Sequence, residues 1–292
     1  MSEAKRRVSF EFFPPKTDAG KKKLLKTVHS LAALEPDFVS VTFGAGGSTR
    51  DGSYEIAAEI VRTTQLSVTP HVSCIGWSVD ALRDMLVCYR EAGIRSIVAL
   101  RGDAPEQEQN VERAFMHANE LVAFVRALGG FQISVACYPE FHPEAPSPTA
   151  DLENFVRKVR AGADEAITQY FYNNDAYYRF VERVRRMGVT VPIVPGLMPM
   201  TDYEQVARFS RFCGADIPSF IRKQMEALAG DAAAQHALGI ELASRQAEDL
   251  LRNGAPGLHL YTLNRAEPTL QVFENLGLVP RTQKADSSVS MS

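Results

Sequence analysis

The chain has 292 residues, of which 45% are hydrophobic and 23% are charged, and its formal net charge is -3. These values are typical of a globular protein with one large domain or two small ones, and the charge gives no reason to expect nucleic acid or an anionic membrane surface as a partner. The N-terminal residues run into the first predicted strand without an apolar signal segment, and no stretch approaches about eighteen uninterrupted apolar residues, so we expect no membrane partner and a cytoplasmic location.

The first predicted strand lies within residues 8–15, which read Val-Ser-Phe-Glu-Phe-Phe-Pro-Pro. Because side chains alternate along a strand, Ser9, Glu11 and Phe13 share one face, and we expect Glu11 to point into a largely apolar interior. Two interpretations are open. Glu11 is a structural acid satisfied by an arginine or a backbone amide, or burial raises its pKa from about 4.3 toward neutrality so that it can deliver a proton.

After this strand one pattern repeats, in which an amphipathic helix ends near a glycine and a short β-rich run follows within a few residues. The β-rich runs begin at about residues 8, 38, 67, 96, 132, 166, 190 and 257. Helices between strands at this spacing indicate parallel βαβ units, and eight units predict an α/β fold, the (β/α)8 TIM barrel. A doubly wound open sheet is the alternative, although no Gly-x-Gly-x-x-Gly follows the first strand.

The chain is longer than a minimal barrel, and the surplus lies between the seventh and eighth predicted strands. Helical spacing there predicts extra helices over residues 203–212, 219–228 and 234–251. We therefore expect one catalytic barrel over residues 1–281, followed by a polar, disordered tail over residues 282–292. The four cysteines are far apart, and the six histidines lack ligand spacing, so no disulfide or metal site is expected.

In a barrel of this kind, functional groups lie past the carboxyl ends of the strands. Seven of the eight predicted ends carry polar residues, which a shared binding site explains better than accidental exposure: Glu11, Thr42, His71, Arg101, Asp103, Tyr138, His142, Gln169, Asn264 and Arg265. The glycine-rich turn 44–49 either cradles a phosphate or is a tight turn that caps a helix. Arg101 and Asp103 either serve a ligand or form a surface ion pair, His142 either bonds a phosphate or faces solvent, and Lys158 alone indicates solvated surface.

Five segments taken together resemble methylenetetrahydrofolate reductase of the bacterial type. They are Val-Ser-Phe-Glu-Phe-Phe-Pro-Pro at 8–15, Phe-Val-Ser-Val-Thr-Phe-Gly-Ala-Gly-Gly-Ser-Thr-Arg-Asp at 38–51, Ala-Leu-Arg-Gly-Asp at 99–103, Ala-Ile-Thr-Gln at 166–169 and Tyr-Thr-Leu-Asn-Arg-Ala-Glu at 261–267. The resemblance, from about residue 8 to 278, implies a homo-oligomeric flavoenzyme with FAD at the barrel mouth. It also implies that NADH or NADPH reduces the flavin and leaves, after which 5,10-methylenetetrahydrofolate is reduced in the same place to 5-methyltetrahydrofolate for methionine synthesis.

Position by position, the resemblance makes Glu11 the general acid that protonates N10 of the folate, which agrees with the second interpretation of the first strand. It places Asp103 beside the flavin, where a negative charge tunes hydride transfer. The positions that match folate or nicotinamide contacts are Gln169, Gln205, Phe209 and Arg265. The positions that match FAD contacts are Thr42, His71, Arg101, Gly102, Asp103, Tyr138, His142, Asp151, Asn154, Arg157 and Lys158.

This resemblance changes the interpretation of Lys158, which shares a helix face with Asp151 and Asn154 and could meet the pyrophosphate. His117 departs from the family pattern, which has an aromatic residue there, usually Tyr. Two other functions remain open: a folate-binding or scaffolding barrel without catalysis, and an aldolase-type lyase, although no predicted strand end carries a Schiff-base lysine. The sequence does not choose between NADH and NADPH, and family habit favours NADH in bacteria.

Overall fold

The computed structural model describes residues 6–43, 50–102 and 112–278. Its strands all pair in parallel, in the order β7-β6-β5-β4-β3-β2-β1-β9-β8. The strands are β1 Arg7–Phe12, β2 Phe38–Val41, β3 Val68–Ser73, β4 Ser96–Leu100, β5 Gln132–Cys137, β6 Glu165–Thr168, β7 Ile193–Val194, β8 Gly196–Leu197 and β9 Gly257–Tyr261.

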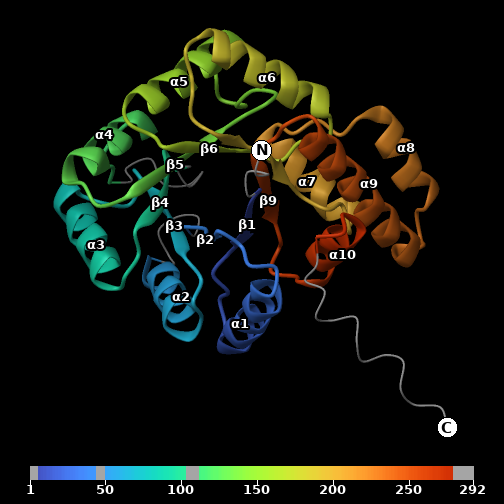
Figure 1. Ribbon diagram of the computed structural model, residues 1–292, viewed down its shortest axis with the longest axis horizontal. Helices are drawn as coiled ribbons and strands as arrows, with labels where there is room; N and C mark the ends of the chain where they lie inside the picture. The colour runs from blue at the N-terminus through green and yellow to red at the C-terminus, as the bar shows by residue number, and fades with distance from the viewer. Residues whose placement is uncertain (1–5, 44–49, 103–111, 279–292) are drawn as a thin grey trace, which may run out of the picture.

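Helices follow the strands along the chain and surround them. They are α1 Asp18–Ala32, α2 Arg50–Thr63, α3 Val79–Glu91, α4 Ala118–Leu128, α5 Pro148–Arg160, α6 Asn174–Arg186, α7 Tyr203–Cys213, α8 Ser219–Ala227, α9 Ala232–Arg252 and α10 Glu267–Asn275. Figure 1 shows α1 and α2 below the strands, α3 and α4 on the left, α5 and α6 above, and α7 to α10 on the right. The extra helices predicted before the last strand are therefore confirmed as α7, α8 and α9.

The sheet closes through a strand that proline divides. β7 pairs with β6 and β8 pairs with β9, and only Pro195 separates β7 from β8 in the chain. Proline has no N–H to donate to a ladder, so the strand is interrupted there, while its carbonyl still accepts a hydrogen bond from the His259 backbone N–H at 3.0 Å. The (β/α)8 prediction is confirmed, except that the seventh strand begins at Ile193 rather than near residue 190.

The two faces of the strands differ in polarity. Outward side chains pack against helices, as Phe10 does against Phe273 of α10, with ring centroids 5.8 Å apart. Inward side chains include many polar groups: Ser9, Glu11, Ser40, Thr69, Ser96, Ser134, Glu165 and His259. The expectation that Glu11 meets a largely apolar interior was therefore wrong, because the alternation that turns Glu11 inward also turns serine, threonine and histidine inward on neighbouring strands.

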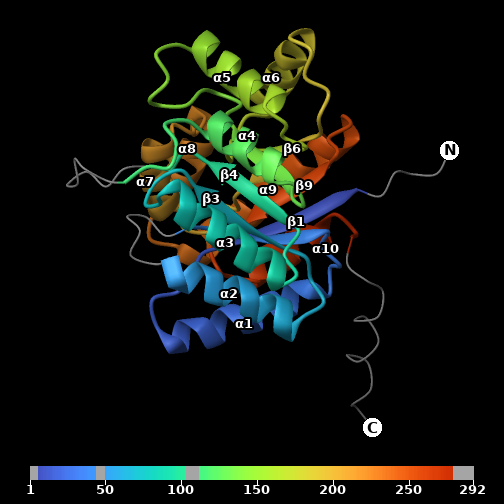
Figure 2. The ribbon, with the colours of Figure 1, turned by 90° about the vertical axis from the view of Figure 1, so that its left-hand side faces the viewer.

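A second, smaller core lies beside the barrel. Residues after β6 and β8 pack there against α7 and α8, with several methionines among them: Tyr170, Met198, Met200, Val206, Ala215, Ile217, Ile221 and Met225. Since β1 begins on the right of Figure 2, the carboxyl ends of the strands face left, and α7 and α8 lie toward that side. This core therefore supports helices at the carboxyl end of the barrel strands.

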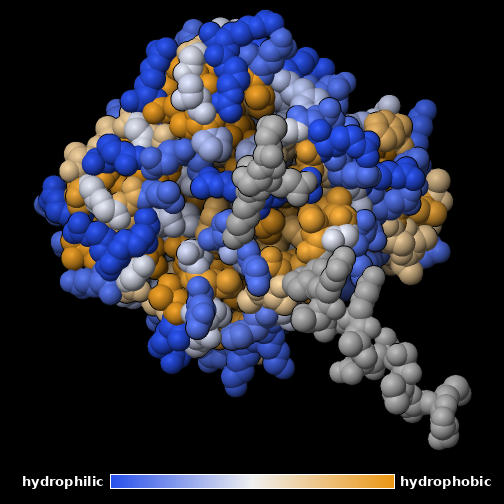
Figure 3. All heavy atoms as spheres, viewed as in Figure 1, coloured by the Kyte–Doolittle hydropathy of each residue, from blue (hydrophilic) through white to orange (hydrophobic). Residues whose placement is uncertain are grey.

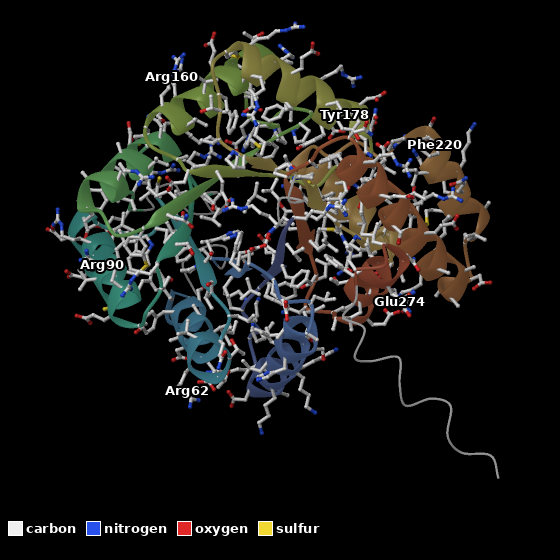
Figure 4. All side chains as sticks on the ribbon, viewed as in Figure 1. Arg62, Arg90, Arg160, Tyr178, Phe220 and Glu274 are labelled. Atoms are coloured by element: carbon white, nitrogen blue, oxygen red, sulfur yellow. The ribbon has the colours of Figure 1, made fainter. Side chains whose placement is uncertain are left out.

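The outer surface follows the amphipathic pattern of the helices. Arg62, Arg90 and Arg160, on three different helices, project away from the strands (Figure 4). Hydrophilic residues cover much of the periphery in the view of Figure 3, and hydrophobic side chains show between them. Within residues 6–43, 50–102 and 112–278, no helix is long and apolar enough to cross a membrane.

Candidate active site at the barrel mouth

Glu11 lies inside the barrel among side chains of β2, β3 and β9. Its Oε2 atom is 3.1 Å from Nε2 of His71 on β3 and 3.5 Å from Nε2 of His259 on β9. Ser40, its register partner on β2, donates a hydrogen bond from Oγ to the same oxygen at 3.3 Å. The side chain of Glu11 is 16% exposed, so these neighbours largely determine its ionisation.

The pKa of Glu11 is lower than the sequence suggested. Burial is the largest influence and raises the pKa, but charge interactions and hydrogen bonds with His71 and His259 outweigh it and lower the pKa from 4.5 to about 2. The expectation that burial moves this pKa toward neutrality was therefore wrong for the described arrangement. It failed because the strand sequence of Glu11 does not reveal which side chains the neighbouring strands place beside it.

His259 is a residue of this site that the motifs did not single out. It is fully buried, and its Nδ1 atom lies 2.8 Å from Oγ of Ser9. Its Nε2 atom faces Glu11, at 3.5 Å from Oε2. The alternation of side chains along β9 could have indicated His259, because it shares a face with Tyr261 at the end of the strand. In the structure, Ser9 of β1 is the register partner of His259.

A cavity of about 410 Å³ lies beside the ends of β4 and β5 and the helix α5. It brings together six of the residues predicted to contact FAD: Arg101, His142, Asp151, Asn154, Arg157 and Lys158. His117 also lines it, so the departure from the family pattern lies at this cavity, and so do Asn119 and Glu144, which sequence reasoning missed. Their position at the cavity could not be predicted from the sequence, since Asn119 precedes β5 in the chain and Glu144 follows it.

Lys158 is an inward-reaching cation on α5. Its Nζ atom donates to the backbone carbonyl of Ala136 on β5 at 2.6 Å, and burial lowers the pKa of its ammonium. On the same helix, Arg157 donates to Oδ1 of Asn154 at 2.6 Å, while Asp151 accepts from the backbone N–H of His142 at 3.0 Å. The interpretation of Lys158 as solvated surface was therefore wrong.

Arg101 forms an ion pair, one of the two possibilities considered from the sequence, and its position beside the cavity leaves ligand binding open. Its guanidinium forms an ion pair with Glu144 at 2.6 Å, and that hydrogen bond lowers the pKa of Glu144. Arg101 nevertheless lines the cavity. The next residue, Gly102, has φ +79°, and a Cβ there would lie 2.0 Å from Oγ of Ser73, so this approach to β3 requires glycine.

The other predicted FAD contacts lie at different points of the mouth. Tyr138 packs the edge of its ring against His142, with ring centroids 4.7 Å apart. Thr42 follows β2, where its backbone N–H donates to the carbonyl of Phe12 at 2.8 Å. His71 contacts Glu11 instead of the cavity. Asp103, the turn 44–49 and the tail 282–292 lie outside the described residues.

The four residues predicted to contact folate or nicotinamide come from three separate elements. Gln169 follows β6 and accepts from the backbone N–H of Tyr170 at 3.0 Å. Gln205 and Phe209 lie one turn apart on α7, and Phe209 is 37% exposed. Arg265 follows β9, and its backbone N–H donates to the carbonyl of Thr262 at 2.9 Å. Gln169 and Arg265 thus lie just past strand ends, whereas Gln205 and Phe209 lie on the helix that follows β8.

The cavity suits part of a dinucleotide. Arg101, Arg157 and Lys158 supply three cationic groups, which complement a pyrophosphate. Asp151 and Asn154 supply oxygen and amide groups that can bond hydroxyls. The volume lies within the range of small-molecule sites but leaves the remainder of a dinucleotide to extend along the mouth.

Comparison with known proteins gives a consistent result. The family model for methylenetetrahydrofolate reductase matches residues 1–277. The chain is 41% identical to 5,10-methylenetetrahydrofolate reductase of Escherichia coli K12 over 94% of this chain and 91% of that protein, and 38% identical to probable methylenetetrahydrofolate reductase (NADH) of Oryza sativa over 94% and 49%. A solved Clostridium thermocellum structure, described as an uncharacterized protein that binds two copies of 5-methyl-5,6,7,8-tetrahydrofolic acid, shares the fold with a TM-score of 0.64, 14% identity and 94% coverage of both chains. The chain described here belongs to the methylenetetrahydrofolate reductase family.

Proposed function

We propose that the chain is an FAD-dependent oxidoreductase that reduces 5,10-methylenetetrahydrofolate to 5-methyltetrahydrofolate with NADH or NADPH, in a ping-pong sequence at one mouth. Family membership supports the folate reaction. The name of the rice relative supports NADH as the reductant. The observation that carries the proposal is a buried carboxylate, Glu11, within a barrel whose carboxyl end also has a cavity lined by three cations.

The residues of the cavity would hold the dinucleotide part of FAD. Arg101, Arg157 and Lys158 would bind its pyrophosphate, and Asp151 and Asn154 would orient it by hydrogen bonds. When bound, FAD would supply hydride transfer between nicotinamide and folate. Asp103 is proposed to tune that transfer, as the resemblance implies.

Glu11 is proposed to hold and deliver the proton that N10 of the folate receives. An acid of low pKa gives up its proton readily, but it is rarely protonated near neutral pH. His71 can supply that proton, since its Nε2 atom lies 3.1 Å from the carboxylate. A bound group that takes the hydrogen bond of His71 would also remove one cause of the low pKa, and the pKa would rise, since burial already acts in that direction and only part of the opposing interactions would remain.

The remaining residues are proposed to bind substrate. Gln169 and Gln205 would bond polar edges of the folate or nicotinamide, Phe209 would pack against a ring, and Arg265 would meet an anionic or carbonyl group. The single barrel over residues 1–281, the homo-oligomer, the cytoplasmic location and the role in methionine synthesis belong to the same proposal.

The variant Glu11→Gln tests the proposal. We expect NADH to reduce the flavin of the variant at nearly the wild-type rate, while transfer to the folate is abolished, because only that half-reaction needs a proton on N10. Anaerobic stopped-flow absorbance follows each half-reaction separately. Glu182→Gln, on the outer surface of α6, is the matched control and should leave both rates unchanged.

Two outcomes would contradict the proposal. Equal loss of both half-reactions would make Glu11 a structural acid. A colourless wild-type protein that FAD does not reconstitute would favour a folate-binding barrel without catalysis.

A further inference from the structure

The turn after β9 has an unusual backbone. Leu263 and Asn264 have φ angles of 48° and 57°, the left-handed region that side chains other than glycine rarely occupy. Asparagine tolerates this region better than most residues, but leucine does not. Two such residues in succession persist only where the surrounding contacts hold them, and strained backbone of this kind is concentrated at functional sites.

The contacts that hold this turn lead to the end of β1. Asn264 accepts a hydrogen bond from the backbone N–H of Phe13 at 3.0 Å, and its side-chain amide donates to the carbonyl of Phe13 at 2.8 Å. One side chain thus satisfies both backbone groups of Phe13, as a neighbouring strand would. Thr27 of α1 donates to the backbone carbonyl of Asn264 at 3.3 Å.

Thr262 extends the same connection to the residue that carries the acid. Its Oγ1 atom donates to the backbone carbonyl of Glu11 at 2.7 Å, and its backbone N–H lies 3.3 Å from that oxygen. The hydroxyl also accepts from the backbone N–H of Asn264 at 3.1 Å, and the carbonyl of Thr262 accepts from the N–H of Arg265. The pairing of β1 with β9, which ends at Glu11 and Tyr261, therefore continues through side chains.

We propose that Asn264 is a positioning residue, whose amide clamps the end of β1 to the turn after β9 and so fixes Glu11 relative to Arg265. This inference rests on the proposed function, in which those two residues act on one folate from separate strands. Without the clamp, Phe13 is no longer held to the turn, and beyond the last backbone pair only the bonds of Thr262 to the carbonyl of Glu11 hold the ends of β1 and β9 together. A displacement of about 1 Å between reacting groups can slow a reaction by about a hundredfold.

The variant Asn264→Gly isolates the clamp, because glycine adopts the left-handed backbone without strain and removes only the amide. We expect the rate of the folate half-reaction to fall about tenfold to a hundredfold, while reduction of the flavin by NADH stays within about twofold and the unfolding temperature stays close to wild type. Asn264→Ala, which also strains the backbone, should show the same kinetic loss with a lower unfolding temperature. Asn253→Ala removes an amide that bonds Asp249 at the end of α9, and should change none of these quantities.

Wild-type folate kinetics in Asn264→Gly would overturn the inference, and so would equal losses in both half-reactions, which indicate a purely structural turn. Measuring the wild-type enzyme in parallel separates this failure from that of the proposed function. If wild-type enzyme does not reduce the folate, the proposed function fails. The clamp is then tested by calorimetric binding of 5-methyltetrahydrofolate to FAD-loaded protein. The inference predicts that Asn264→Gly binds it about tenfold more weakly than wild type, and equal affinities would overturn it.

Discussion

The ionisation of Glu11 shows how neighbouring strands decide the chemistry of a single residue. Burial alone would raise its pKa, yet the imidazoles of His71 and His259, both close to one carboxylate oxygen, reverse the direction. The same contacts make Glu11 a source of folding free energy. Its carboxylate is stabilised by the fold more than the neutral acid is, so protonation must work against the folded state.

This gives a prediction for stability against pH. Since the pKa of Glu11 in the folded protein is about 2 and the ordinary value is 4.5, its contribution is fully present above pH 4.5 and is lost as the pH falls toward 2. The free energy of unfolding should therefore decline more steeply over this range in wild type than in Glu11→Gln, by on the order of 3 kcal/mol in total. Urea unfolding at a series of pH values measures the two slopes, and identical slopes would show that the histidines do not stabilise this carboxylate.

A second prediction concerns Lys158, whose ammonium lines the cavity and bonds Ala136. A charge-assisted bond to a pyrophosphate contributes about 1.5–3 kcal/mol, so Lys158→Met should weaken FAD binding about tenfold to a hundredfold. Quenching of FAD fluorescence gives the Kd. Lys223→Met on the exposed side of α8 is the control of equal charge change, and an unaltered Kd in Lys158→Met would remove this lysine from the flavin site.

Part of the site could be predicted from the sequence, but the partners of Glu11 could not. Alternation along one strand correctly turned Glu11 inward, and the family resemblance selected six residues that the fold gathers in one cavity. Neither gave the partners of Glu11. Ser40, His71 and His259 lie on other strands, and their approach depends on register, which no local pattern specifies.

At the scale of elements, the division between β7 and β8 is the point where the barrel closes. Helical periodicity predicted α7, α8 and α9 to within two residues at each end, because amphipathic spacing is a local property. The strand before them was placed less accurately, since apolar residues and prolines alternate there and only pairing with β6 and β9 decides which residues join the ladder. Gly196, in β8, lies close to Thr168 and Tyr261 at this closure.

Gly196→Ala should therefore destabilise the barrel, because the added methyl group does not fit at this position. A Cβ at Gly196 would lie 2.3 Å from the backbone oxygen of Thr168 and 2.6 Å from the ring of Tyr261, and overpacking of this kind costs about 3 kcal/mol. Gly188→Ala is the matched control: a Cβ there meets nothing within 4 Å, but φ is +87°, so only backbone strain of about 1 kcal/mol is expected. Urea unfolding of both variants tests the difference, and equal losses would mean that β8 shifts to make room.

At the scale of the whole molecule, the barrel brings chemistry from distant parts of the chain to one end. Glu11 comes from the first strand, the cation-lined cavity from the middle of the chain, and Arg265 from the turn after β9. These groups lie at the same end of the barrel because the strands are parallel and their carboxyl ends meet on one side. The sequence order of the elements predicted this convergence, whereas the distances between the groups depended on the side-chain contacts across strands.

The convergence leads to a kinetic prediction for the proposed reaction. If nicotinamide and folate use the same part of the mouth, they exclude each other, and the reductant must leave before the folate binds. Initial rates at several fixed folate concentrations should then give parallel lines when the reciprocal rate is plotted against the reciprocal of NADH concentration, and high folate should inhibit competitively against NADH. Phe209→Ala should raise the KM for both substrates, because an exposed ring on α7 would serve whichever of them is bound. Intersecting lines would instead require nicotinamide and folate to be bound together, and would show that the mouth holds two separate sites.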